Sequence, residues 1–316
     1  MSNASGTLTL PKIDPGTRPG VPIGSGNAWR SAAGTVLALS IVVSLFLQAG
    51  SVNVALLLGQ ISRSPFFWLS LAGAILVSPA IDWLILRRLW NLSPAGLVPL
   101  LQKQAANEAV FGYSGDAQFY LWARDNAAPA VSPFETLRDL SVLSALAGNL
   151  ATLLLMALTY PVLRALVSGP LMSVAIIAVA IVVGTSIAIF VVQRLLFRFS
   201  LSKPQVAGVL AAFLVRIALS LFFTSMLWSM LVPGVAAGTL LLLATVRMML
   251  SRVPFLPGKE AVFAGVTLFL MHDAAALAHA VAVVSALLMS INLLLCGGAL
   301  IGGGARATKR LSRERR

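Results

Sequence analysis

Residues 205–231, QVAGVLAAFLVRIALSLFFTSMLWSML, decide the fold class of this chain. They contain one charged residue, Arg216, and the stretch exceeds the roughly 20 apolar residues that a helix needs to cross a bilayer. Comparable apolar stretches occupy 32–50, 66–86, 139–163 and 170–193. The sequence therefore predicts an all-α, polytopic membrane protein.

The composition of the whole chain points the same way. Of its 316 residues, 58% are hydrophobic and 10% are charged, and the mean hydropathy is +0.92. Soluble proteins carry roughly 25% charged residues, so this composition excludes an ordinary soluble enzyme. The net charge of +13 does not indicate nucleic-acid binding, because the basic residues stand between apolar runs instead of gathering on one wet face.

The pattern is less regular after residue 231. Three further apolar segments lie at 233–250, 261–271 and 274–301. Pro233 and Gly234 open the first of these, and 261–271 is too short to cross a bilayer alone. We expect about eight hydrophobic segments with six to eight full crossings, the sixth and seventh segments being either crossings or a re-entrant pair.

The distribution of basic residues predicts the orientation in the membrane. Lysine and arginine cluster at 87–88, 194–203, 247–259 and 306–316, and such clusters favour the cytoplasmic side. Both termini are therefore predicted to be cytoplasmic. We divide the chain into a disordered tail at 1–30, a transmembrane domain at 31–303 and a basic tail at 304–316.

A polar insert at 91–138 interrupts the apolar segments. Half of the ten acidic residues lie between Glu108 and Asp139. In the same region Asp116, Tyr120 and Arg124 recur at the spacing of one helix face, and arginine suits bidentate phosphate binding. We expect these three side chains to converge on an anionic group. The alternative is an interfacial loop, with Tyr120 as a headgroup anchor and Asp116 as a helix cap.

Two further charged residues are candidates for a polar path. Arg216 lies near the middle of an apolar segment, where a charge must face protein or a wet cavity. It either pairs with Asp82 or Asp273, or binds a lipid phosphate. Glu260 follows a proline- and glycine-rich turn at 253–258 and falls in the first turn of an expected helix. That position marks either a simple capped helix start or a binding site at an interrupted helix.

The sequence gives only weak signs of a proton relay, a metal site or a catalytic site. His272 and Asp273 could form a proton relay, although an outer hairpin turn is the interpretation we favour. No third ligand accompanies them, so no metal site is expected. The sequence has no P-loop and no Gly-x-Ser-x-Gly elbow, and we expect no catalytic residues and no cofactor. Ser144, Gly148 and Thr152 form a small-residue packing stripe.

The order of these features resembles the flippase-like integral membrane family, which includes the transmembrane region of lysylphosphatidylglycerol synthases. The resemblance spans roughly residues 32–301. The matching segments are Asn107…Gly115-Asp116…Arg124, Thr136-Leu137-Arg138-Asp139 and Pro257-Gly258-Lys259-Glu260. It implies re-entrant elements around an internal cavity that accepts lipid headgroups, and no soluble aminoacyl-transferring domain is present in this chain.

Three functions follow as hypotheses. The first is translocation of a phospholipid or lipid-linked precursor across the bacterial inner membrane, with Asp116, Tyr120, Arg124, Arg216 and Glu260 along the path of an anionic headgroup. The second is a non-transporting membrane partner of proteins that synthesise envelope lipid or polysaccharide. The third is a proton-coupled small-solute carrier that uses His272 and Asp273.

Overall fold

The computed structural model describes residues 64–109, 114–126, 132–166, 200–252, 259–270 and 275–314, with short pieces at 184–185 and 188. These residues belong to one compact unit, Ser40–Arg316. The predicted tail at 1–30, the segment 32–50, most of 170–193, His272 and Asp273 lie outside the described residues. Within the described ranges the chain is helical and contains no strand, which confirms the predicted all-α class.

Four of the described helices are long and apolar enough to cross a membrane. They are α3 (Pro65–Trp90), α6 (Pro133–Leu166), α8 (Lys203–Leu231) and α11 (Ala275–Glu314), with the apolar part of α11 at Ala276–Gly298. These helices correspond to the predicted segments 66–86, 139–163, 205–231 and 274–301. The structure thus confirms four of the apolar helices on which the membrane assignment was based.

The polar insert folds as two short helices that follow a single 3-10 turn. The turn is η1 (Pro94–Gly96), and the helices are α4 (Leu97–Ala109) and α5 (Ser114–Asn126). Helix α5 contains Asp116, Tyr120 and Arg124, whose spacing predicted one helix face.

The two remaining helices are short. They are α9 (Ala237–Ser251, 15 residues) and α10 (Lys259–Leu270, 12 residues), and both fall below the roughly 20 residues of a full crossing. The short sixth and seventh segments of the sequence therefore form short helices.

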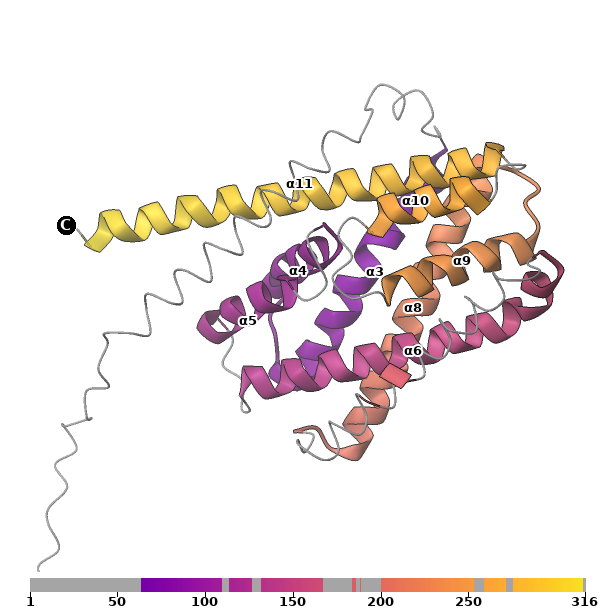
Figure 1. The fold of residues 1–316 in the computed structure, drawn as a ribbon. Coiled ribbons are helices and arrows are strands. Elements are labelled where there is room, and N and C mark those ends of the chain that lie inside the picture. Colours follow the sequence, from indigo (N-terminus) through magenta and orange to yellow (C-terminus); the bar gives the residue numbers. More distant parts are fainter. Residues whose placement is uncertain are drawn as a thin grey trace, which may run out of the picture. The chain divides into compact units, whose positions relative to one another are not determined.

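The helices pack around α8 and α11 (Figure 1). Helix α3 lies along α8, α6 packs against both α8 and α9, and α4 and α10 pack against α11. Two apolar clusters result. One centres on Leu86, Phe119 and Leu143 from α3, α5 and α6, and the other includes Phe67 and Trp228 from α3 and α8.

The outer surface of α8 is strongly apolar. Only 11% of its most apolar window is buried within the protein, and the large side chains of Val215 and Phe222 are more than half exposed, at 51% and 55%. Soluble monomers rarely expose apolar surface of this extent. This helix has the surface expected of a segment that contacts lipid.

Candidate functional site

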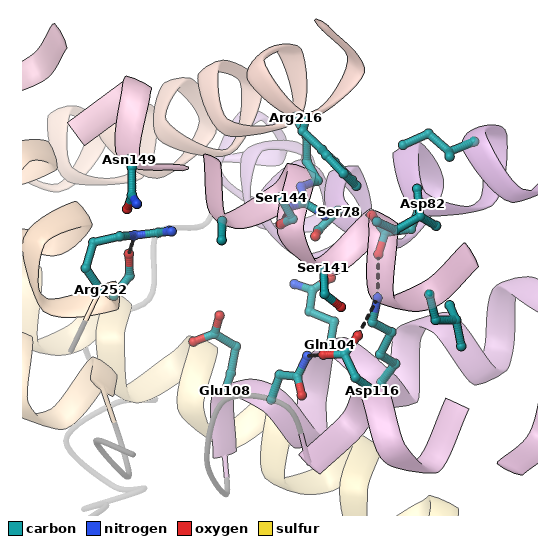
Figure 2. Close-up of a pocket in the computed structure, with 18 of the residues that line it drawn as sticks. Ser78, Asp82, Gln104, Glu108, Asp116, Ser141, Ser144, Asn149, Arg216 and Arg252 are labelled. Carbon is teal, nitrogen blue, oxygen red and sulfur yellow. Dashed lines mark hydrogen bonds and ion pairs between the residues drawn. The ribbon is translucent and has the colours of Figure 1, made fainter. Parts of the chain in front are cut away.

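A cavity of about 410 Å³ lies among helices α3, α4, α5, α6 and α8, with the end of α9 and the start of α10 at its edge (Figure 2). Its wall combines apolar side chains such as Leu86 and Phe213 with many polar ones. Seven charged residues line it: Asp82, Lys103, Glu108, Asp116, Arg216, Arg252 and Lys259. Such a concentration of charge inside a chain with 10% charged residues makes this cavity the candidate site.

Lys103 bridges two carboxylates on one side of the cavity. Its Nζ lies 3.1 Å from Asp82 Oδ2 on α3 and 3.1 Å from Asp116 Oδ1 on α5. The three side chains are between 13% and 23% exposed. Burial alone would lower the pKa of Lys103, but the two carboxylates outweigh burial and hold this pKa above its ordinary value.

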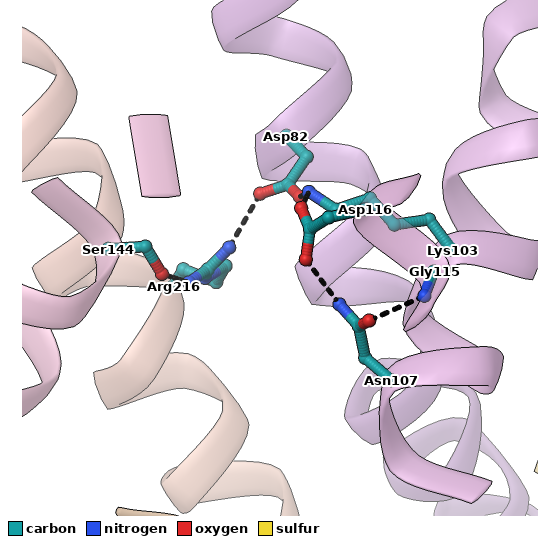
Figure 3. Close-up of polar contacts among 7 residues, drawn as sticks. All are labelled: Asp82, Lys103, Asn107, Gly115, Asp116, Ser144 and Arg216. Carbon is teal, nitrogen blue, oxygen red and sulfur yellow. Dashed lines mark hydrogen bonds and ion pairs between the residues drawn. The ribbon is translucent and has the colours of Figure 1, made fainter. Parts of the chain in front are cut away.

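Arg216 shares the Asp82 carboxylate from the opposite side (Figure 3). Its Nη1 lies 2.6 Å from Asp82 Oδ1 and its Nη2 donates to Ser144 Oγ at 2.7 Å. The guanidinium also lies 4.4 Å from the centre of the Phe213 ring, a cation–π arrangement. Of the two structural partners considered from the sequence, the structure therefore pairs Arg216 with Asp82. Ser144, predicted as a packing residue, is an acceptor in this pair.

Hydrogen bonds between α4 and α5 hold Asp116 in place. Asn107 on α4 donates from Nδ2 to Asp116 Oδ2 at 2.9 Å, and its Oδ1 accepts from the Gly115 backbone N–H at 2.8 Å (Figure 3). A Cβ at Gly115 would lie 1.9 Å from the Lys103 carbonyl oxygen, so only glycine permits this contact between the helices. The Gly115 of the predicted motif therefore serves close packing.

A second polar group occupies the other side of the cavity in Figure 2. Arg252, at the end of α9, donates from Nε to Ser251 Oγ at 3.2 Å and lies beside Asn149. A Cβ at Gly148 would lie 2.2 Å from Arg252 Nη1, so the guanidinium occupies space that the absent side chain leaves open. Glu108 and Lys259 line the cavity as well.

Two of the five predicted path residues, Asp116 and Arg216, line this cavity. Tyr120 and Arg124 are absent from its wall. Arg124 is 40% exposed and forms a 2.9 Å ion pair with Asp125, and this hydrogen bond raises the pKa of Arg124. Asp116 instead forms its ion pair with Lys103 of α4, so the ion pairs of Asp116 and Arg124 are made with different residues.

Glu260 lies next to the cavity without lining it. Its side chain is 9% exposed and its Oε1 forms an ion pair with Arg247 Nη2 of α9. Within the described part of the chain, Glu260 Oε2 and Arg247 Nε have no hydrogen-bond partner. The predicted carboxylate at the first turn of α10 is therefore present, but its contact is with α9.

Sequence reasoning missed several residues of the site. Lys103 was overlooked even though it is the only basic residue between Arg88 and Arg124, a signal that could have singled it out. Asn149 also carries a signal, because a polar side chain within the apolar segment 139–163 favours the protein interior. Gln104 and Arg252 carry no comparable signal, because polar residues at those positions are equally typical of exposed helix surfaces.

Comparison of the chain with protein-family models, with curated proteins and with solved structures found no match.

Proposed function

We propose that this protein is an inner-membrane translocase that accepts the anionic headgroup of a phospholipid or lipid-linked precursor in its polar cavity. The observation that carries the proposal is a cavity with seven charged side chains among helices whose outer faces are apolar. A charge at bilayer depth is costly and faces the protein interior or a water-filled path. Polar headgroups need such a path to cross.

The size and charge of the cavity suit this ligand. Its volume of about 410 Å³ falls within the roughly 300–1,000 Å³ of small-molecule sites. Four cations and three carboxylates line it, so the formal balance, four minus three, is one positive charge. That balance favours an anion, while the apolar faces of α8 accommodate acyl chains outside the cavity.

The short helices complete the proposed topology. The end of α9 and the start of α10 both reach the cavity, through Ser251 and Lys259, and each helix is too short to cross the bilayer singly. We assign them to a re-entrant pair shielded by protein, as the resemblance to flippase-like proteins implies. With an even number of crossings, both termini lie on the cytoplasmic side.

Translocation by purified protein in liposomes tests the proposal. Fluorescent phosphatidylglycerol in the inner leaflet becomes accessible to dithionite only after translocation. We expect Ser141→Trp, which fills the cavity from α6, to slow this step at least tenfold. Leu150→Trp is the matched control, because Leu150 lies on the same helix and is 43% exposed. Equal rates for wild type and Ser141→Trp would show that the cavity is not the path.

The liposome experiment, extended by co-purification and solute uptake, also tests the non-transporting partner and the proton-coupled carrier. Liposomes with wild-type protein that translocate no faster than empty liposomes, together with a stable co-purifying membrane partner, would favour the non-transporting role. Uptake of a small solute that depends on pH and disappears in His272→Ala would favour the proton-coupled carrier.

A further inference from the structure

The charged residues of the cavity differ in how far their charges are already paired. Asp82, Lys103, Asp116 and Arg216 form a closed set of ion pairs with two cations and two carboxylates. Arg252 is engaged as well, by the hydrogen bond at its Nε and by a further interaction. A ligand at any of these groups would have to displace a partner and leave a poorly solvated charge, which is costly. Contacts with a ligand are therefore expected from the remaining charged residues.

Two charged residues of the cavity wall remain, Glu108 on α4 and Lys259 at the start of α10. The two helices contact each other. Within the described part of the chain, neither side chain forms a hydrogen bond or an ion pair. The charge of Glu108 acts on Arg247, but the ion pair of Arg247 is with Glu260. The cavity therefore keeps one carboxylate and one ammonium group that are available to a ligand.

Gln104 adds a second acceptor beside Glu108. The two residues are four apart on α4 and share a helix face, and both line the cavity (Figure 2). Gln104 Oε1 is fully buried and has no hydrogen-bond partner among the described residues, whereas buried polar atoms are normally hydrogen-bonded. An amide oxygen and a carboxylate on one face suit a positively charged group with several N–H donors, as a primary ammonium is.

Lys259 supplies the opposite charge at the same cavity. A lysine ammonium group is a common binder of phosphate. Because Glu108 and Lys259 come from contacting helices and do not pair with each other, a ligand that carries both charges satisfies both residues. A purely anionic headgroup would leave Gln104 without a donor and would bring its phosphate towards the Glu108 carboxylate.

We propose that Gln104 and Glu108 bind the ammonium group of a zwitterionic headgroup whose phosphate lies at Lys259. This inference rests on the proposed function, because it names the class of headgroup that the same cavity recognises. The anion of that function is then the phosphate, and the ligand is a phosphate ester that also carries a primary amine. Either a lipid headgroup or a free amino-alcohol phosphate supplies this chemistry.

Binding to the purified full-length protein in a neutral detergent tests the inference. The probes are dioctanoyl phosphatidylethanolamine, dioctanoyl phosphatidylglycerol, which shares the phosphate but has no ammonium group, and free phosphoethanolamine. We expect wild type to bind the ethanolamine lipid about tenfold more tightly than the glycerol lipid. Glu108→Gln should abolish this preference by weakening only the ethanolamine lipid, and Gln104→Met should reduce it. Lys259→Gln should weaken both lipids to a similar extent, because both carry the phosphate.

Glu135→Gln is the matched control, since it makes the same change of charge at an exposed residue of α6 and should leave the preference at its wild-type value. The thermal midpoint of Glu108→Gln should also equal that of wild type, because Glu108 has no ion pair to lose within the described helices.

The source of the ligand and the validity of the inference are decided separately. Phosphoethanolamine that binds as tightly as the lipid, with the same dependence on Glu108, would support the ammonium site and assign it to a soluble phosphate ester. Equal affinity of wild type for the two lipids, or an undiminished preference in Glu108→Gln, would overturn the inference. The translocation experiment with phosphatidylglycerol would still decide the proposed function by itself.

Discussion

The ammonium group of Lys103 lies 3.1 Å from the carboxylate of Asp82, although 21 residues separate the two in sequence. The contact joins a short helix of the polar insert to one of the long apolar helices. Both side chains are largely buried, at 17% and 13% exposure. Each charge has therefore lost most of its contact with water, and the ion pair offsets that loss. The insert is thereby part of the helical body and not an independent surface loop.

Removal of the Asp82 charge should destabilise the protein strongly. Asp82→Asn leaves Lys103 and Arg216 without the carboxylate that they share. Breaking a buried pair by removing one partner costs about 3–5 kcal/mol, so the thermal midpoint in detergent, followed by circular dichroism, should fall clearly. Asp125→Asn removes an exposed carboxylate paired with Arg124 and should leave the midpoint unchanged. Equal midpoints for the two variants would contradict the structural role of Asp82.

The α4–α5 contact predicts a contrast between two glycines. Gly115→Ala places a Cβ against the Lys103 carbonyl oxygen, and because backbone cannot give way locally, the cost should be about 3 kcal/mol or more. Gly208→Ala in α8 meets no atom within 4 Å and should be neutral or stabilising by up to about 1 kcal/mol. Urea or thermal unfolding of the two variants measures the difference. A tolerated Gly115→Ala would mean that the two helices are not in contact.

The ion pairs of Lys103 predict a specific dependence on pH. Burial opposes the charge of Lys103, but Asp82 and Asp116 outweigh it and raise its folded-state pKa above the ordinary 10.5. A raised pKa stabilises the fold fully below the unfolded-state pKa, and this stabilisation disappears only as pH rises through the folded-state value. The midpoint difference between wild type and Lys103→Met should therefore stay constant from about pH 6 to 9 and shrink only in stronger base. A difference that shrinks near pH 8 would indicate that the pairs are solvated.

The sequence predicted the helices better than it predicted their contacts. The apolar stretches at 66–86 and 205–231 predicted α3 and α8 correctly, because the length and hydropathy of a segment can be read from that segment alone. For Arg216 the sequence offered two structural partners, Asp82 and Asp273, because a charge deep in an apolar segment needs an opposite charge or a wet cavity beside it. Asp116 was expected to converge with Tyr120 and Arg124, whereas its polar contacts are with Lys103 and Asn107. Its contact with Lys103 depends on the angle between α4 and α5, which Gly115 sets through packing and which no residue spacing reveals.

The Arg247–Glu260 pair should be less important for stability than its burial suggests. Both residues keep one atom without a hydrogen-bond partner within the described part of the chain, Arg247 Nε and Glu260 Oε2, so the desolvation of the pair is only partly offset. Glu260→Leu alone should cost about 3–5 kcal/mol because it leaves the Arg247 guanidinium uncompensated. The double variant Arg247→Met/Glu260→Leu should be more stable than either single variant, because it removes both charges from α9 and α10.

Thermal unfolding of wild type, the two single variants and the double variant forms a double-mutant cycle for this pair. Non-additivity of about 0.5–3 kcal/mol in favour of the double variant is expected, since the residues share one contact. Strictly additive losses would show that the two side chains do not interact. If the double variant is stable and still binds phosphatidylglycerol as wild type does, the pair only joins α9 to α10. A loss of binding in a stable double variant would instead make Glu260 part of the headgroup path, as its place in the sequence motif predicts.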